Sequence, residues 1–436
     1  MLDTGLFTIP LLSLLAVFGF AVITDVNMIA FDVKSVPQMA RDMGFDAENV
    51  RDTIMYKIYA IANTAETSRG VTYSTISDMR LQSLRNLSET LGIESSVLAA
   101  QGFLGLIPYR LKGKIMQEGD TLHLVITGFS SNNDSFILDL KNDTPILHSA
   151  QIIKGQAGLM RGANDTRILI ANTNIEIRAL LQRAAEAIVD RIDPYLLARY
   201  YFVLESPTAT FTKTIPQLMR CIEVLPKHQQ VWPLLLWGRT YQINGEYTKA
   251  IKIYKQISQL DPKFPFSPLR WGETLAKEKK YTEAIVMYQK AIDNSRFYPN
   301  YPIARSTAYS LWADALISLG KITQAEKILI EGVNTFYFGN ERSNANALIH
   351  NALGRFLMEY KKNYVDAEYH LRQAVYMSDD PKYYSSLQEV IEKMIPEYKK
   401  RNETVLEPLT TEIMTNAEDN NSENLPITSI LPRENP

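Results

Sequence analysis

A 34-residue spacing in the second half of the chain restricts its fold more than any other feature of the sequence. Five positions show this spacing: Gly238, Tyr241, Ala250, Tyr254 and Ile257 recur 34 residues later as Gly272, Leu275, Ala284, Tyr288 and Ala291. Small residues at such positions allow two antiparallel helices to cross closely, and the aromatic ring fills the space beside the crossing. A repeat of this length predicts stacked pairs of helices.

Two further units keep the same internal spacing. The third unit carries Ala313, Leu316, Ala325, Leu329 and Gly332, and the fourth carries Gly354, Leu357, Ala367, Leu371 and Ala374. A seven-residue extension within 294–302 precedes the third unit, and one extra residue lies in the turn at 361–364 of the fourth. The sequence therefore predicts repeats at 231–264, 265–298, 306–339 and 347–381, inside an all-α region covering 176–399.

These residues resemble the tetratricopeptide repeat family, over roughly residues 194–380. The resemblance implies a right-handed solenoid of helix pairs with a concave groove lined by the first helix of each unit, where partners of this family usually bind. Upstream, residues 194–201 and 216–226 are interpreted as a degenerate capping unit, because terminal repeats are often atypical. Cys221 then fills a small-residue packing position and is not expected to be a reactive thiol.

The repeat register assigns a mixed, partly apolar set of side chains to this groove. They are Trp232, Leu235, Arg239, Gln242, Phe266, Leu269, Glu273, Lys277, Thr307, Ser310, Asp314, Leu348, Asn351, Arg355 and Met358. Such a lining suits an extended segment or a helix of another protein. The sequence equally allows that Trp232 and Phe266 only pack on adjacent helices. Glu273 and Asp314 occupy positions where capture of a C-terminal carboxylate needs lysine and asparagine, so that type of partner is not expected.

The segment before the repeats changes from helical to alternating periodicity. A helix starting at Asp46 places Val50, Ile54, Ile58 and Ile61 on one face, and a second helix is predicted at 81–91. Strands are predicted at 109–116, 121–127, 136–140 and 167–171, the first two joined as a hairpin. Residues 32–37 are predicted to be an extended linker. Residues 30–175 are therefore expected to form a small α+β domain with helices on a mostly antiparallel sheet.

Both ends of the chain have a distinctive composition. Residues 5–24 contain no charge, and a run of about 20 apolar residues matches a hydrocarbon thickness of about 30 Å. A cleaved signal peptide is disfavoured, because no basic residue precedes this run and no clean A-x-A site follows it. We expect a transmembrane anchor. The polar, proline-containing residues 402–436 are predicted to be a disordered tail.

The side of the membrane is predicted less directly. Lys34 and Arg41 follow the apolar run and weakly favour a cytoplasmic soluble part. Scarce cysteine and the common architecture of short N-terminal anchors favour the opposite side, so we expect a bacterial inner-membrane protein with a periplasmic soluble part. The layout also resembles bacterial membrane proteins that carry Val36-Pro37, a short gap, Gly44 and an amphipathic helix.

Charge and motif content exclude several functions. The 46 lysines and arginines nearly balance the 48 aspartates and glutamates, so no global field attracts nucleic acid. One cysteine excludes an intramolecular disulfide framework. No phosphate loop, dinucleotide pattern or nucleophile elbow is present. The histidines lack metal-ligand spacing and are His123, His148, His228, His350 and His370. We therefore expect no catalytic activity, no cofactor and no metal.

Two hypotheses about function follow from this organisation. The first is a membrane-anchored interaction scaffold that binds other proteins through the groove of its repeats. The alternative is a sensory or regulatory protein, in which the α+β domain binds a small ligand and the repeats relay the signal or dimerise. A ligand that binds only the native state would raise the melting temperature of the protein, which distinguishes the two.

Overall fold

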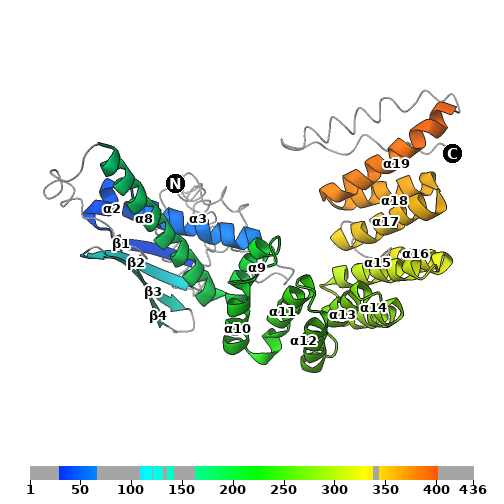
Figure 1. Cartoon of the computed structure of the whole chain (residues 1–436), viewed down its shortest axis with the longest axis horizontal. Coiled ribbons are helices and arrows are strands. Elements are labelled where there is room, and N and C mark those ends of the chain that lie inside the picture. Colours follow the sequence, from blue (N-terminus) through cyan, green and yellow to red (C-terminus); the bar gives the residue numbers. More distant parts are fainter. Residues whose placement is uncertain are drawn as a thin grey trace, which may run out of the picture. The chain divides into compact units, whose positions relative to one another are not determined.

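The computed structural model describes residues 29–65, 109–119, 121–130, 135–141, 163–336 and 343–400, shown as coloured ribbons in Figure 1. The chain forms two compact units, Met1–Leu236 and Trp237–Pro436. The predicted anchor at 5–24, the predicted helix at 81–91 and the predicted tail at 402–436 all lie outside the described residues. Within the described ranges, no helix combines the length and the apolar character that crossing a membrane requires.

A four-stranded sheet with the order β1-β2-β3-β4 lies in the first unit. Its strands are β1 (Ile29–Ser35), β2 (Tyr109–Glu118), β3 (Thr121–Ser130) and β4 (Ser135–Lys141). β1 runs parallel to β2, whereas β2, β3 and β4 pair antiparallel. The hairpin, the strand at 136–140 and the mostly antiparallel character of the sheet were therefore predicted correctly.

Strand β1 occupies most of the segment predicted as an extended linker at 32–37, so that prediction was wrong. Ile29, Phe31 and Val33 are buried, while Asp32 and Lys34, on either side of Val33, are exposed. This alternation is the pattern of a strand with one face against the core. A segment that starts at Asp32 omits Ile29 and Phe31, two of these three buried residues.

Helices α2 (Gln38–Asp42), α3 (Ala47–Ala65) and α8 (Ala163–Ile192) accompany the sheet. α3 packs against β1 and α8, and α8 packs against β4. The predicted apolar face of α3 is confirmed, because Val50, Ile54, Ile58 and Ile61 are all buried in the core shared with the strands.

The strand predicted at 167–171 is wrong, because these residues lie inside the 30-residue helix α8. A short apolar run does not distinguish a strand from a buried helix segment. The longer pattern does: Ile177, Leu181, Ala184 and Ile188 are buried at helical spacing along the same element. Helical structure therefore begins well before residue 176, where the all-α region was predicted to start.

The predicted capping unit is a helix pair, α9 (Pro194–Glu205) and α10 (Thr214–Val224), which pack on each other. α9 begins with proline at its first position, and the Asp193 carboxylate accepts a hydrogen bond from the backbone N–H of Tyr195 at 3.1 Å. Cys221 is fully buried in α10, and this burial raises the pKa of its thiol to about 12. The interpretation of Cys221 as a packing residue agrees with this position.

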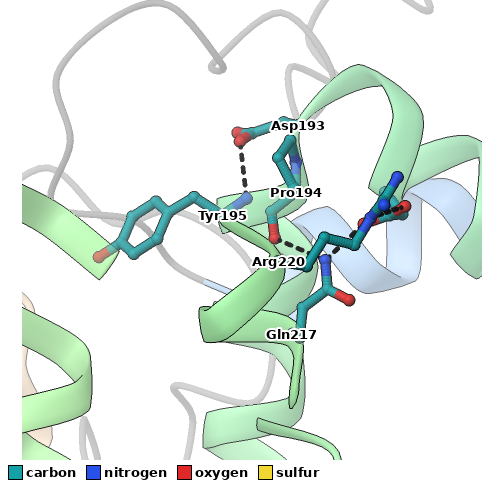
Figure 2. Close-up of polar contacts among 6 residues, drawn as sticks. Asp193, Pro194, Tyr195, Gln217 and Arg220 are labelled. Atoms are coloured by element: carbon teal, nitrogen blue, oxygen red, sulfur yellow. Dashed lines mark hydrogen bonds and ion pairs between the residues drawn. The ribbon is translucent and has the colours of Figure 1, made fainter. Parts of the chain in front are cut away.

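Polar contacts tie α10 to the junction of α8 and α9 (Figure 2). The Gln217 side-chain amide donates to Asp190 Oδ1 at 2.5 Å and to the Pro194 carbonyl at 3.2 Å. Arg220 Nε lies 2.7 Å from Asp190 Oδ2. The Asp190 carboxylate on α8 thus receives two donors from one face of α10, which holds the capping pair against the long helix.

The second unit consists of consecutive helices, which Figure 1 shows stacked in chain order. After the short helix η2 (Lys227–Gln229) of the first unit, they are α11 (Val231–Ile243, which contains the boundary between the two units in the sequence), α12 (Tyr247–Leu260), α13 (Phe266–Lys277), α14 (Tyr281–Ser295), α15 (Pro302–Ser318), α16 (Ile322–Phe336), α17 (Asn344–Phe356), η3 (Leu357–Lys361), α18 (Tyr364–Met377) and α19 (Pro381–Lys400). Each predicted repeat corresponds to one helix pair, from α11–α12 to α17–α18, and α19 packs against the last pair.

The close crossing predicted within each pair is present. A Cβ atom added to Gly238 would lie 2.3 Å from Tyr254 Cε1, and one added to Gly272 would lie 2.6 Å from Tyr288 Cε1. Both tyrosines are almost completely buried. The rings therefore lie directly on the helix positions that lack a side chain, which leaves no room for any residue other than glycine there.

The extra residue of the fourth repeat is accommodated in a π-helical turn. Residues Leu357–Lys361 form this turn at the end of α17, and Lys362 follows in a left-handed conformation with φ of 55°. Lys361 forms an ion pair with Glu326 of the preceding repeat, with Nζ and Oε2 2.7 Å apart. A π-turn is the usual way for a helix to accommodate one inserted residue without losing its register.

We expect the Gly272→Val variant to be destabilised by about 1–3 kcal/mol, because the added carbons collide with the Tyr288 ring and with the Ala284 carbonyl. Urea denaturation followed by circular dichroism measures this. The matched control is Gln289→Val, which places the same β-branched residue on an exposed position of α14 and should cost well under about 1 kcal/mol. Equal stability of the two variants would contradict the crossing.

Candidate functional site

The first helices of successive repeats form the inner side of the second unit. α13 packs on α15 and α15 packs on α17, whereas the second helices α12, α14, α16 and α18 make no comparable contact with one another in the part of the chain that is described. A stack whose members approach on one side and separate on the other is curved, with the approaching side concave.

One charged residue stands at the same position of each first helix. These residues are Arg239, Glu273, Asp314 and Arg355, and each directly follows the small residue of its helix crossing. Because a helix turns by about 100° per residue, a side chain next to the crossing points away from the second helix. Asp314 and Arg355 are exposed, and the other two are half-buried. The inner side thus carries a row of charges in the order positive, negative, negative, positive.

Two further charged residues form ion pairs with members of this row and were missed in the sequence. Arg270 Nη1 lies 2.5 Å from Glu273 Oε1, and Arg355 Nη2 lies 3.0 Å from Glu359 Oε1. Both pairs have the spacing of residues that are neighbours on one helix face, i,i+3 and i,i+4. That spacing relative to the predicted residues was the signal that could have identified Arg270 and Glu359.

Asp314 has the least compensated charge of the row. Its side chain forms no ion pair among the described residues, and desolvation by the surrounding helices raises the pKa of its carboxyl. Arg355 acts in the opposite direction and Glu359 in the same direction, and desolvation prevails. The surroundings of Asp314 therefore do not fully compensate its charge.

The tyrosines of the helix crossings lie beneath the row of charges. Burial raises the pKa of the Tyr254 and Tyr288 hydroxyls, and the carboxylate of Glu273 raises both further, whereas Arg270 lowers both. Arg239 also acts on Tyr254, and Asp314 on Tyr288. The same rings that fill the crossings therefore extend to the charged inner side, so the positions of the charges depend on the packing below them.

Several predicted groove residues are not accessible. Leu235, Gln242, Phe266 and Leu269 are each less than 9% exposed. Gln242 Nε2 donates to Thr274 Oγ1 at 3.1 Å, which links α11 to α13. The Phe266 ring contacts the Tyr301 ring edge-on at 5.8 Å between centroids. Phe266 therefore packs on its neighbours, which is the alternative that the sequence left open.

Met358 is also buried, and the other predicted residues lie closer to solvent. Trp232 of the first unit is half-buried, Lys277 at the end of α13 is exposed, and Asn351 on α17 is half-buried. No hydrogen-bond partner of Asn351 Oδ1 is found in the described residues. The partly or fully exposed members of the predicted set thus include Trp232 as well as polar residues, whereas the Oδ1 atom of Asn351 is buried.

The described residues hold no group of three or more histidine, cysteine, aspartate or glutamate side chains arranged for a metal ion. An open pocket of about 440 Å³ lies on the outer helix α16, and its lining shares no residue with the charged row. It is lined by Lys327, Ile330, Glu331, Asn334 and Thr335.

Comparison with known proteins identifies one of the repeats directly. A sequence model of the tetratricopeptide repeat matches residues 234–264, which coincide with the first predicted unit. The chain therefore contains a tetratricopeptide repeat at α11–α12. The match covers the close crossing of Gly238 with Tyr254 and the residue Arg239 beside it.

Several solved structures resemble the chain weakly. A chain of the APC/C hetero-tetramer Cut9-Hcn1 is 17% identical over 56% of this chain and 46% of its own, with a TM-score of 0.34. BtubC (BKLC) from P. vanneervenii is 16% identical over 53% and 98%, with a TM-score of 0.38. Pseudomonas aeruginosa pilF is 14% identical over 51% and 97%, with a TM-score of 0.34. The chain thus spans less than half of the first of these, and none of these likenesses bears on its function.

We expect Asp314→Asn to raise the midpoint of thermal unfolding at pH 7. The folded state raises the pKa of this carboxyl, so its ionised form costs folding free energy above that pKa, and asparagine removes the cost. The difference should shrink as the pH falls from 7 through the raised pKa of this carboxyl, below which the wild-type side chain is protonated. Melting curves across this range measure it. Asp293→Asn on α14 should change little, and an Asp314→Asn variant less stable than wild type at pH 7 would refute the assignment.

Proposed function

We propose that this chain is a protein-interaction scaffold that binds a segment of another protein along the inner side of its repeats, without catalysis. The observation that carries this proposal is the row of Arg239, Glu273, Asp314 and Arg355 at one equivalent position of successive first helices. The tetratricopeptide repeat match at 234–264 supports it, because repeats of this class commonly bind proteins. The poorly compensated Asp314 supports it further, since an unpaired charge costs stability unless a ligand uses it.

The order of the charges defines the partner's chemistry. Neighbouring helices pack about 8–10 Å apart, so three intervals between four first helices extend over roughly 24–30 Å. An extended chain covers this length with about eight or nine residues at about 3.3 Å each. We propose a partner segment of that length with basic residues in its centre and acidic residues toward its ends. Exposed ion pairs are individually weak, so the series determines register and direction more than affinity.

Charge reversal on the inner side tests the proposal. A photo-cross-linking residue at position 310 on α15 should capture a partner protein, and the additional substitutions Asp314→Lys and Arg355→Glu should each abolish this capture by repelling the complementary charge. Mass spectrometry of the cross-linked species measures both.

The matched controls lie on the outer helix α14, where Asp293 and Lys290 are exposed. The substitutions Asp293→Lys and Lys290→Glu should leave the capture at position 310 unchanged. A cross-linker at Gln289 of the same helix should capture nothing specific. If the outer substitutions reduce the capture as much as the inner ones do, binding does not use the charged row.

We also propose that residues 5–24 anchor the scaffold in a bacterial inner membrane, with the repeats in the periplasm. The uncharged apolar run of membrane-spanning length supports the anchor. Deletion of residues 1–28 should move the protein from the membrane pellet to the supernatant after carbonate extraction. A reporter that functions only outside the cytoplasm should be active when fused after Pro436, and a reporter that functions only in the cytoplasm should be inactive there. Full extraction of the intact chain would contradict the anchor, and an active cytoplasmic reporter would contradict the orientation.

A further inference from the structure

Two histidines face each other in the fourth repeat. His350 lies on α17 and His370 on α18, and their Nδ1 atoms are 2.9 Å apart. The ring centroids are separated by 5.1 Å and the ring planes are inclined at 39°. The two residues come from the two helices of one crossing, so their separation is determined by the packing that Gly354 makes against Leu371.

The environment favours uncharged rings at this position. Both histidines are half-buried, and desolvation lowers the pKa of His350 to about 4 and also lowers the pKa of His370. The proximity of His370 lowers the pKa of His350 further, whereas Asp366, one turn earlier on α18, opposes the lowering of the pKa of His370. Neutral imidazole is the form that ligates metal ions, so neither ring must lose a proton first.

The separation of the two nitrogens selects among coordination geometries. Two imidazole nitrogens bound at about 2.05 Å and at right angles lie about 2.9 Å apart, whereas a tetrahedral angle places them about 3.3 Å apart. The observed 2.9 Å corresponds to adjacent positions of a square-planar or tetragonal ion. Cu²⁺ and Ni²⁺ adopt this geometry and bind imidazole well.

We propose that His350 and His370 chelate one Cu²⁺ or Ni²⁺ ion through their Nδ1 atoms. Without the ion, one Nδ1–H donates to the other nitrogen, and with it both lone pairs converge on the metal. The described residues supply no set of three ligands, so water fills the remaining positions. The ion joins α17 to α18 and thereby stabilises the last repeat, whose inner helix carries Arg355.

Copper electron paramagnetic resonance on the full chain tests this site. One equivalent of CuCl₂ should give a tetragonal spectrum with superhyperfine structure from two equivalent nitrogens. The metal should also raise Tm in a thermal-shift assay, because it binds only the native state. A spectrum with fewer than two nitrogen ligands from protein side chains would overturn the proposal, whether or not any variant folds.

Substitution of each histidine tests whether it is a ligand of the metal ion. His350→Gln and His370→Gln should each lose the two-nitrogen signal and the metal-induced rise in Tm, while far-UV circular dichroism checks that the helices are retained. His228→Gln is the matched control, since His228 is exposed on the short helix η2 and outside the second unit. If both ligand variants bind Cu²⁺ as the wild type does, the proposed site is wrong.

Discussion

The close crossing of two helices within each repeat is the constraint on which the second unit depends. At Gly272 the Tyr288 ring lies where a side chain would otherwise begin, and the same contact occurs between Gly238 and Tyr254. Such a contact fixes the rotation of the first helix about its own axis, because any other rotation brings a side chain onto the ring. The direction of every neighbouring residue on that helix is then determined as well.

This contact determines where the charged residues lie on the inner side. Arg239 and Glu273 each follow a crossing glycine by one residue, and Asp314 and Arg355 follow the corresponding small residues of the later units. Neither the seven-residue extension before the third repeat nor the extra residue of the fourth repeat changes this one-residue offset from the crossing. The second insertion is absorbed in the π-turn after α17, beyond the crossing. Insertions between crossings therefore change the turns and leave the charged positions in the same register.

The sequence predicted the elements whose periodicity is long and failed where the informative pattern was short. Helix α3 was recognisable because Val50, Ile54 and Ile58 repeat over several turns. Residues 167–171 were assigned to a strand because five residues are too few to separate period two from a buried helix. Strand β1 was missed because its apolar residues Phe31 and Val33 straddle the point where the linker was thought to begin.

Prediction of the candidate site was limited in a different way. The repeat register identified Glu273 and Asp314 correctly as residues of the first helices, because that placement needs only spacing. It could not show that Leu269 is covered by its neighbours, since coverage depends on how adjacent units pack. The pairing of His350 with His370 was equally hidden, because the two residues are 20 positions apart and meet only when α17 and α18 pack.

The burial of Cys221 has a practical consequence. It is the only cysteine of the chain, and its fully buried thiol with a pKa of about 12 stays protonated and unreactive at neutral pH. A cysteine introduced on an inner or outer helix would thus be the single thiol open to maleimide reagents. Spin labels or fluorophores can be attached at chosen repeat positions in the otherwise unaltered protein, so the curvature of the repeat stack can be followed as distances in solution.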